Sequence, residues 1–170
     1  MWTQIIAALA ALTLGSPVIS AAQSSQQKSG DTYQWSGEFV SADTAASTLT
    51  VRARVAYQEA LSELKQFKPG ERVWIVWSGV HDYSDAVRQF RRAEAGNKIG
   101  EDLVMPAELV STEAPNQYVT VRLKVSGNSL AAINGVKAGE WVTITSRHRP
   151  SSDAEVVVEV KPYAATANKT

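Results

Sequence analysis

One motif occurs twice in this chain and constrains its fold more than any other feature. Residues 68–75 read Lys-Pro-Gly-Glu-Arg-Val-Trp-Ile, and residues 137–144 read Lys-Ala-Gly-Glu-Trp-Val-Thr-Ile. In both copies a glycine, which takes a positive φ at little cost, precedes a segment of alternating apolar residues typical of a β-strand. The recurrence predicts two copies of one small β-rich unit.

Alternating apolar residues extend the repeat toward the N-terminal side of each motif. Each half has two segments with apolar residues at every second position, the period of a strand with one buried face. Val51 and Val121 mark the clearest pair, seventy positions apart (121 minus 51). The residues predicted to face inward are Tyr33, Trp35, Gly37, Phe39, Leu49, Val51, Ala53 and Val55 in the first half, and Leu103, Met105, Ala107, Leu109, Val119, Val121, Leu123 and Val125 in the second. Those predicted to face outward are Thr48, Thr50, Arg52, Arg54, Thr120, Arg122 and Lys124.

A short amphipathic helix is predicted after the second strand of each half, at residues 59–67 and 129–136. Its apolar face consists of Ala60, Leu61, Leu64 and Phe67 in the first half and of Leu130, Ile133 and Val136 in the second. A third strand follows the repeated glycine in each half. Its predicted inward residues are Val73, Ile75, Val142 and Ile144.

The last strand of each unit is less uniform. In the second half Val156, Val158 and Val160 are predicted to face inward from a closing strand. Residues 84–96 of the first half start with the same Ser-Asp-Ala sequence, but they also have the serine cap and glycine stop of a helix. The repeat favours a strand, since a unit without one would have an open edge; a helix is the alternative.

The predicted order in each unit is strand, strand, helix, strand, strand. With the glycine and acidic residue before the third strand, this order resembles the small OB-like and cradle-loop barrels. The predicted fold is therefore mainly β with short helices, as two OB-like repeats in tandem or merged into one composite barrel with pseudo-twofold symmetry. Units of about 60 residues are marginally stable alone, so we expect a large shared interface in either arrangement.

The start of the chain predicts export. Residues 1–14 have no charged side chain, a Gly-Ser-Pro break follows, and small residues precede a cleavage site near Ala22, as in a secretory signal. The chain has no cysteine and therefore no disulfide. We expect a signal peptide at 1–22, a polar linker at 23–32, repeats at 33–96 and 103–163 joined by a linker at 97–102, and a flexible tail at 164–170. The mature protein should be periplasmic or extracellular, without a membrane span.

The Lys-Pro-Gly-Glu turn after an apolar helix also resembles the small periplasmic copper-carrying barrels. That resemblance implies metal binding through methionine, histidine and a stacking tryptophan. Apart from the first residue, the sequence has one methionine, Met105, in an inward register, so we do not expect copper binding here. His81 and His148 follow the third strands and are weak metal candidates, because two arginines flank His148. No metal or cofactor is predicted.

The outward face of the third strands differs between the halves. Trp74 and Val76 occupy positions where the second half has Thr143 and Thr145, and Trp141 shares their outward direction. Apolar residues on this face predict either packing against the other unit, contact with a partner protein, or an aromatic platform that stacks a sugar ring or a base.

Arginines form the local basic excess of a chain whose 17 basic and 17 acidic residues balance. They are either a solvated face or, beside a tryptophan, a groove for an anionic glycan or nucleic acid. The arginines of this cluster are Arg88, Arg91, Arg92, Arg147 and Arg149.

The sequence has no nucleophile elbow, no phosphate-binding glycine loop and no zinc-type histidine spacing, so we do not predict an enzyme. The predicted function is binding or assembly through protein contact, including self-association, across the outward aromatic face. The alternatives are a glycan- or polyanion-binding module and, more weakly, a metal-handling periplasmic protein.

Overall fold

The computed structural model describes residues 32–77, 86–92, 104–147 and 156–164, and it is mainly β. The chain order is β1 (Thr32–Asp43), β2 (Thr48–Val55), α1 (Gln58–Leu64), β3 (Arg72–Trp77), β4 (Ala86–Arg92), β5 (Val104–Glu113), η2 (Ala114–Asn116), β6 (Tyr118–Lys124), η3 (Gly127–Ile133), β7 (Trp141–Arg147) and β8 (Val157–Pro162). The predicted strand within residues 84–96 is confirmed as β4, so the helix alternative is wrong.

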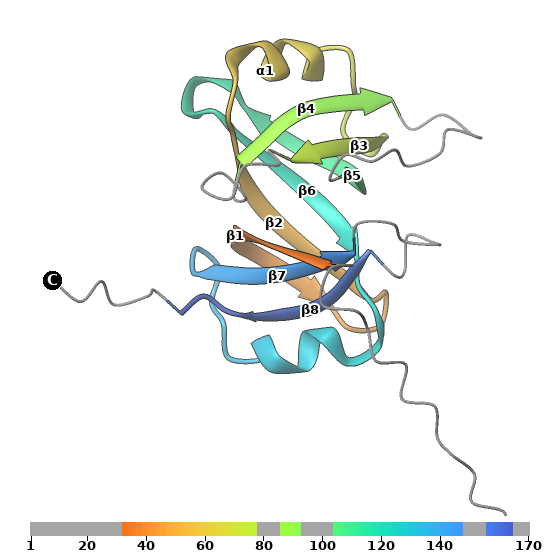
Figure 1. Cartoon of the computed structure of the whole chain (residues 1–170), viewed down its shortest axis with the longest axis vertical. Coiled ribbons are helices and arrows are strands. Elements are labelled where there is room, and N and C mark those ends of the chain that lie inside the picture. Colours follow the sequence, from red (N-terminus) through yellow and green to blue (C-terminus); the bar gives the residue numbers. More distant parts are fainter. Residues whose placement is uncertain (1–31, 78–85, 93–103, 148–155, 165–170) are drawn as a thin grey trace, which may run out of the picture.

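One sheet contains all eight strands, in the order β4-β3-β5-β6-β2-β1-β7-β8. A further parallel pairing between β4 and β2 closes five of them into a small barrel, and β1, β7 and β8 extend it. Figure 1 shows α1 and the short helix η3 at opposite ends of the molecule, with β2 and β6 running between them. In the sheet, pairs of strands from the two halves alternate: β4 and β3, then β5 and β6, then β2 and β1, then β7 and β8.

The pairings of the first half have counterparts in the second. Strand β3 pairs with β5, and β7 pairs with β1, so the third strand of each half joins the first strand of the other. Val51 and Val121 are direct partners in the central β2–β6 ladder. The contact of Val55 with Val87 that closes the barrel corresponds to an isolated parallel bridge between Val125 and Val157.

The predicted core is largely confirmed. A single cluster of buried apolar side chains fills the interior, and it includes Val51, Val121, Met105 and the apolar faces of α1 and η3. Gly70 and Gly139 have φ values of +88° and +92°, as the repeated motif predicts. These two turns are also tied to the other half, because the Gly70 N–H donates to the Leu109 carbonyl and the Gly139 N–H to the Phe39 carbonyl.

Strand β8 departs from the predicted alternation. Val156 and Val160 are buried, but Val157 is fully buried and Val158 only half-buried, so the expectation that Val158 faces inward is wrong. The cause is a β-bulge: the β7–β8 register shifts between Thr145 and Ser146. A bulge places two residues of one strand opposite one of the other and so reverses the alternation beyond it.

Several expectations fall on residues outside the described ranges. These are the signal peptide at 1–22, nearly all of the linker at 23–32, the inter-repeat linker at 97–102, most of the tail at 164–170, and the inward position of Leu103. Within the described ranges, no helix is both long and apolar enough to cross a membrane.

Candidate functional site

A polar groove lies where β5 separates from β6. The two strands are paired from Glu108 to Glu113 of β5, and beyond Glu108 the strand β5 continues along β3 instead. The groove encloses about 570 Å³ between the β1–β2 hairpin and strands β3 and β5. Its lining residues are Ser41, Ala42, Asp43, Ala46, Thr48, Thr50, Gly70, Arg72, Pro106, Ala107, Glu108, Arg122, Leu123 and Lys124.

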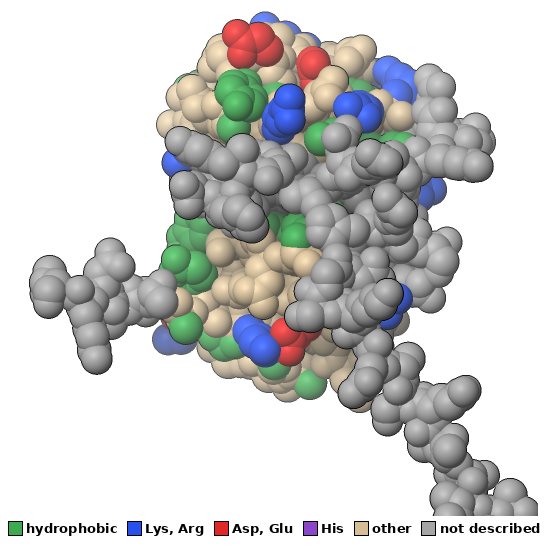
Figure 2. Space-filling view, in the orientation of Figure 1, with side chains coloured by type: hydrophobic (Ala, Val, Ile, Leu, Met, Phe, Trp, Pro, Cys, Tyr) green, Lys and Arg blue, Asp and Glu red, His purple; other side chains and the backbone are tan. Residues whose placement is uncertain are grey.

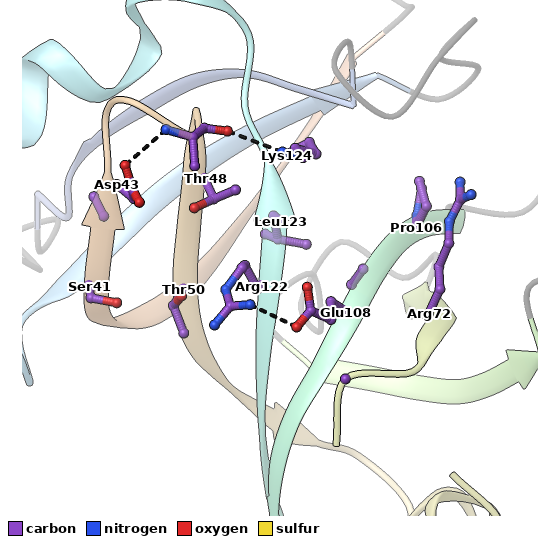
Figure 3. Close-up of a pocket in the computed structure, with 14 residues that line it drawn as sticks. Ser41, Asp43, Thr48, Thr50, Arg72, Pro106, Glu108, Arg122, Leu123 and Lys124 are labelled. Carbon is purple, nitrogen blue, oxygen red and sulfur yellow. Dashed lines mark hydrogen bonds and ion pairs between the residues drawn. The ribbon is translucent and has the colours of Figure 1, made fainter. Parts of the chain in front are cut away.

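Arg122 projects from β6 into this groove. Figure 3 shows its guanidinium between Thr50 and Glu108. The Arg122 Nη1 donates to the Glu108 Oε1 at 2.7 Å, which is a single-pronged ion pair. A guanidinium carries five N–H donors. Within the described part of the chain Arg122 has one hydrogen-bonded partner, Glu108, and its side chain is 43% exposed and lines the groove.

Two threonine side chains form the floor of the groove beside β6. Thr48 and Thr50 alternate with the inward Leu49 and Val51, as predicted, but are only 8% and 7% exposed. At the rim, Lys124 donates from Nζ to the Ala46 carbonyl oxygen at 3.1 Å, and Asp43 accepts the Ala46 N–H at 2.9 Å (Figure 3). The groove thus combines hydroxyls, three cationic side chains and two carboxylates.

The residue that corresponds to Arg122 in the other half is Arg52, seventy positions earlier (122 minus 52). Arg52 binds Glu38 at 2.7 Å and makes a two-pronged pair with Glu113 at 2.8 and 3.0 Å. Its guanidinium carbon also lies 3.9 Å from the centre of the Tyr118 ring. These contacts raise the pKa of Arg52 and lower the pKa of Glu113 through their shared hydrogen bonds.

Two substitutions between the halves distinguish the two arginines. Glu113 and Tyr118 of the Arg52 cluster correspond to Asp43 and Thr48 in the groove, one side chain shorter by a methylene and the other lacking a ring. Carboxylates and an aromatic ring therefore surround the guanidinium of Arg52. The guanidinium of Arg122 instead faces open space of the size given above.

The tryptophans predicted as a binding face are only partly available. Trp74 is half-buried between Arg91 and Pro106 on the neighbouring strands, and Val76 is 3% exposed. Trp141 is half-buried at the start of β7, opposite Glu38 of β1. Trp74 and Trp141 lie on strands that do not pair with each other, so they do not form one platform.

The predicted arginine cluster is divided between distant strands. Arg88 is exposed on β4 and Arg147 is half-buried at the end of β7, and these strands are not neighbours in the sheet. Arg92 packs over the Phe67 ring at 5.1 Å and lies 3.8 Å from Glu71. Figure 2 likewise shows acidic and basic side chains interspersed on the face in view. Arg149 lies outside the described residues.

The weak metal candidates His81 and His148 also fall outside the described residues. In the part of the chain that the structure describes, no three histidine, cysteine or carboxylate side chains are grouped as metal ligands would be. Met105 is fully buried, and its sulfur lies 3.8 Å from the Ser146 hydroxyl.

Sequence reasoning placed Thr48, Thr50, Arg122 and Lys124 of the groove on an outward face but gave them no role. A signal was nevertheless present in the alignment of the two halves. Arg52 and Arg122 coincide in that alignment, while their neighbours change from Tyr118 and Glu113 to Thr48 and Asp43. Where both halves have an arginine but its neighbours are smaller in one half, that half has space beside the arginine.

Comparison with known proteins finds no relative of this chain. No family model, curated protein or solved structure matches the chain.

Proposed function

We propose that this chain is an exported binding protein without catalytic activity, and that its groove holds an acidic glycan. Arg122 and Lys124 would bind a carboxylate of the glycan. The hydroxyls of Thr48 and Thr50, with the carboxylate of Glu108, would bind sugar hydroxyls.

The observation that supports this proposal most is the contrast between Arg122 and Arg52. Both arginines occupy the same position in their halves, yet Arg52 binds two carboxylates through three hydrogen bonds, whereas Arg122 binds one carboxylate through one, at the edge of a groove. An arginine in a groove pairs well with carboxylates because its planar donors match their geometry. Lys124 lines the same groove from the same strand as Arg122, which favours an acidic ligand over a neutral one.

The mixture of groups favours a sugar acid over a small inorganic anion. A site for a bare anion needs donors only, whereas this groove also presents the carboxylates of Asp43 and Glu108. Those acceptors suit the hydroxyl hydrogens of a sugar. Protein contact across Trp74 and Val76, the other function suggested by the sequence, has less support because Val76 is almost completely buried.

Calorimetric titration tests the proposal with oligogalacturonate, whose every ring carries a carboxylate, and with a neutral maltooligosaccharide of equal length. We expect the acidic chain to bind and the neutral one to bind at least tenfold more weakly. Arg122→Ala should weaken the acidic chain by roughly ten- to a hundredfold, since a hydrogen bond to a charged group contributes about 1.5–3 kcal/mol.

Arg54→Ala is the matched control, because Arg54 is an exposed arginine of the same outward face that does not line the groove. It should leave the affinity within about twofold of the original protein. Equal losses for Arg54→Ala and Arg122→Ala would mean unspecific charge attraction and would refute the proposal. No binding of the acidic chain at low salt would also refute it.

A further inference from the structure

An aromatic pair stands on the same sheet as the groove. Trp141 opens β7, and Tyr163 follows β8 with its backbone N–H donating to the Trp141 carbonyl oxygen at 2.9 Å. Their rings are 6.4 Å apart between centres and inclined by 58°. Tyr163 is 48% exposed and Trp141 half-buried, so the pair forms an open aromatic corner held in place by the backbone.

Polar groups connect this corner to the central strands. Glu38 of β1 is the direct neighbour of Trp141 on one side and of Arg52 on the other. Arg52 holds the Glu38 carboxylate at 2.7 Å, so the carboxylate has a fixed position beside the indole. An apolar ring face next to an oriented carboxylate suits a sugar, whose C–H face stacks while its hydroxyls form hydrogen bonds.

The row of neighbouring outward side chains formed by Trp141, Glu38 and Arg52 continues into the groove. On the central ladder Arg52 is opposite Thr120, and Arg122 is opposite Thr50, so the two arginines are diagonal neighbours. Such neighbours lie roughly 7–8 Å apart. From Trp141 to Arg122 the path crosses two strand spacings and then this diagonal, roughly 17 Å in all. Several sugar rings are needed to cover that distance.

We propose that Trp141 and Tyr163 form a stacking subsite for an acidic oligosaccharide that extends from the groove across Arg52. This inference rests on the proposed function and adds to it the length and direction of the ligand. The acidic ring lies at Arg122 and Lys124, and a ring further along the chain stacks on Trp141. The intervening rings pass over the ion pair of Arg52 with Glu38.

The length of the oligosaccharide distinguishes binding in the groove from stacking on Trp141. Galacturonate dimers should reach only the groove, whereas hexamers should reach Trp141 as well. We expect Trp141→Ala to weaken hexamer binding roughly tenfold, the effect of losing one aromatic stacking contact. Dimer affinity should stay unchanged. Tyr57→Ala, which removes an exposed tyrosine beside α1 and away from this row, is the control and should change neither affinity.

Trp141→Phe keeps an aromatic face and should retain most of the hexamer affinity, which separates loss of the ring from loss of folding. Equal hexamer affinity for the Trp141→Ala variant and the original protein, with Arg122→Ala still weakening both chains, would overturn the stacking subsite and leave the groove in place. Failure of both dimer and hexamer to bind would instead refute the proposed function itself.

Discussion

The hydroxyl of Ser146 makes a quantitative prediction about the core. Ser146 is fully buried on β7, and its Oγ accepts the indole N–H of Trp35 at 2.9 Å. Trp35 is 1% exposed, so no water can easily replace this acceptor. Removing one partner of a buried hydrogen bond costs about 1–3 kcal/mol. Ser146→Ala should therefore lower the free energy of unfolding by about 2 kcal/mol.

Urea denaturation followed by far-ultraviolet circular dichroism measures this change. With a slope of about 1–3 kcal/mol per molar urea, the midpoint should fall by roughly 1 M. Ser36→Ala is the matched control, since the same atom is removed from a half-buried serine on the outward face of β1. It should stay within about 0.5 kcal/mol of the original protein.

A double-mutant cycle with Trp35→Phe tests the cause. Phenylalanine lacks the N–H, so Ser146→Ala should cost less in the Trp35→Phe background than in the original protein. The difference, a coupling of about 1–2 kcal/mol, belongs to the hydrogen bond. Additive effects, or a loss below about 0.5 kcal/mol for Ser146→Ala alone, would show that this bond does not stabilise the fold.

Two further predictions concern pH and the repeated turn. Burial of the Tyr33 hydroxyl raises its pKa above the usual value near 10, so above that pH the unfolded chain releases a proton that the folded chain keeps. Stability should then fall with rising pH by up to about 1.4 kcal/mol per unit, and Tyr33→Phe should lessen the fall in urea denaturation between pH 9 and 11; parallel curves would contradict this. Gly70→Ala, at a φ of +88°, should cost about 1–2 kcal/mol, whereas Gly135→Ala, without a positive φ, should be neutral or slightly stabilising in the same assay; equal effects would refute the backbone argument.

Much of the fold could be predicted because its signals are local or periodic. Alternation placed Val51 and Val121 correctly, and the motif placed Gly70 and Gly139 correctly. The bulge before Ser146 could not be predicted, because it depends on how β7 and β8 are paired and leaves no mark in the composition of either strand.

The candidate site was less accessible to sequence reasoning. The sequence drew attention to Trp74 and Val76 because they are apolar on an outward face, and the structure half-buries the first and buries the second. The groove depends instead on the separation of β5 from β6 beside Arg122, which is a property of three-dimensional pairing. Only Trp141 belongs both to the predicted face and to the subsite proposed above.

The exchange of strands between the halves also determines when this protein can fold. Thr32 pairs with Arg147, and the third strand of each half completes its ladder only with the first strand of the other. Contacts between such distant segments make folding slow, because the ends of a long loop must meet before any energy is gained. During synthesis β1 can pair with β2, but its other edge has no partner until β7 has emerged, so that edge of the sheet stays open for most of translation.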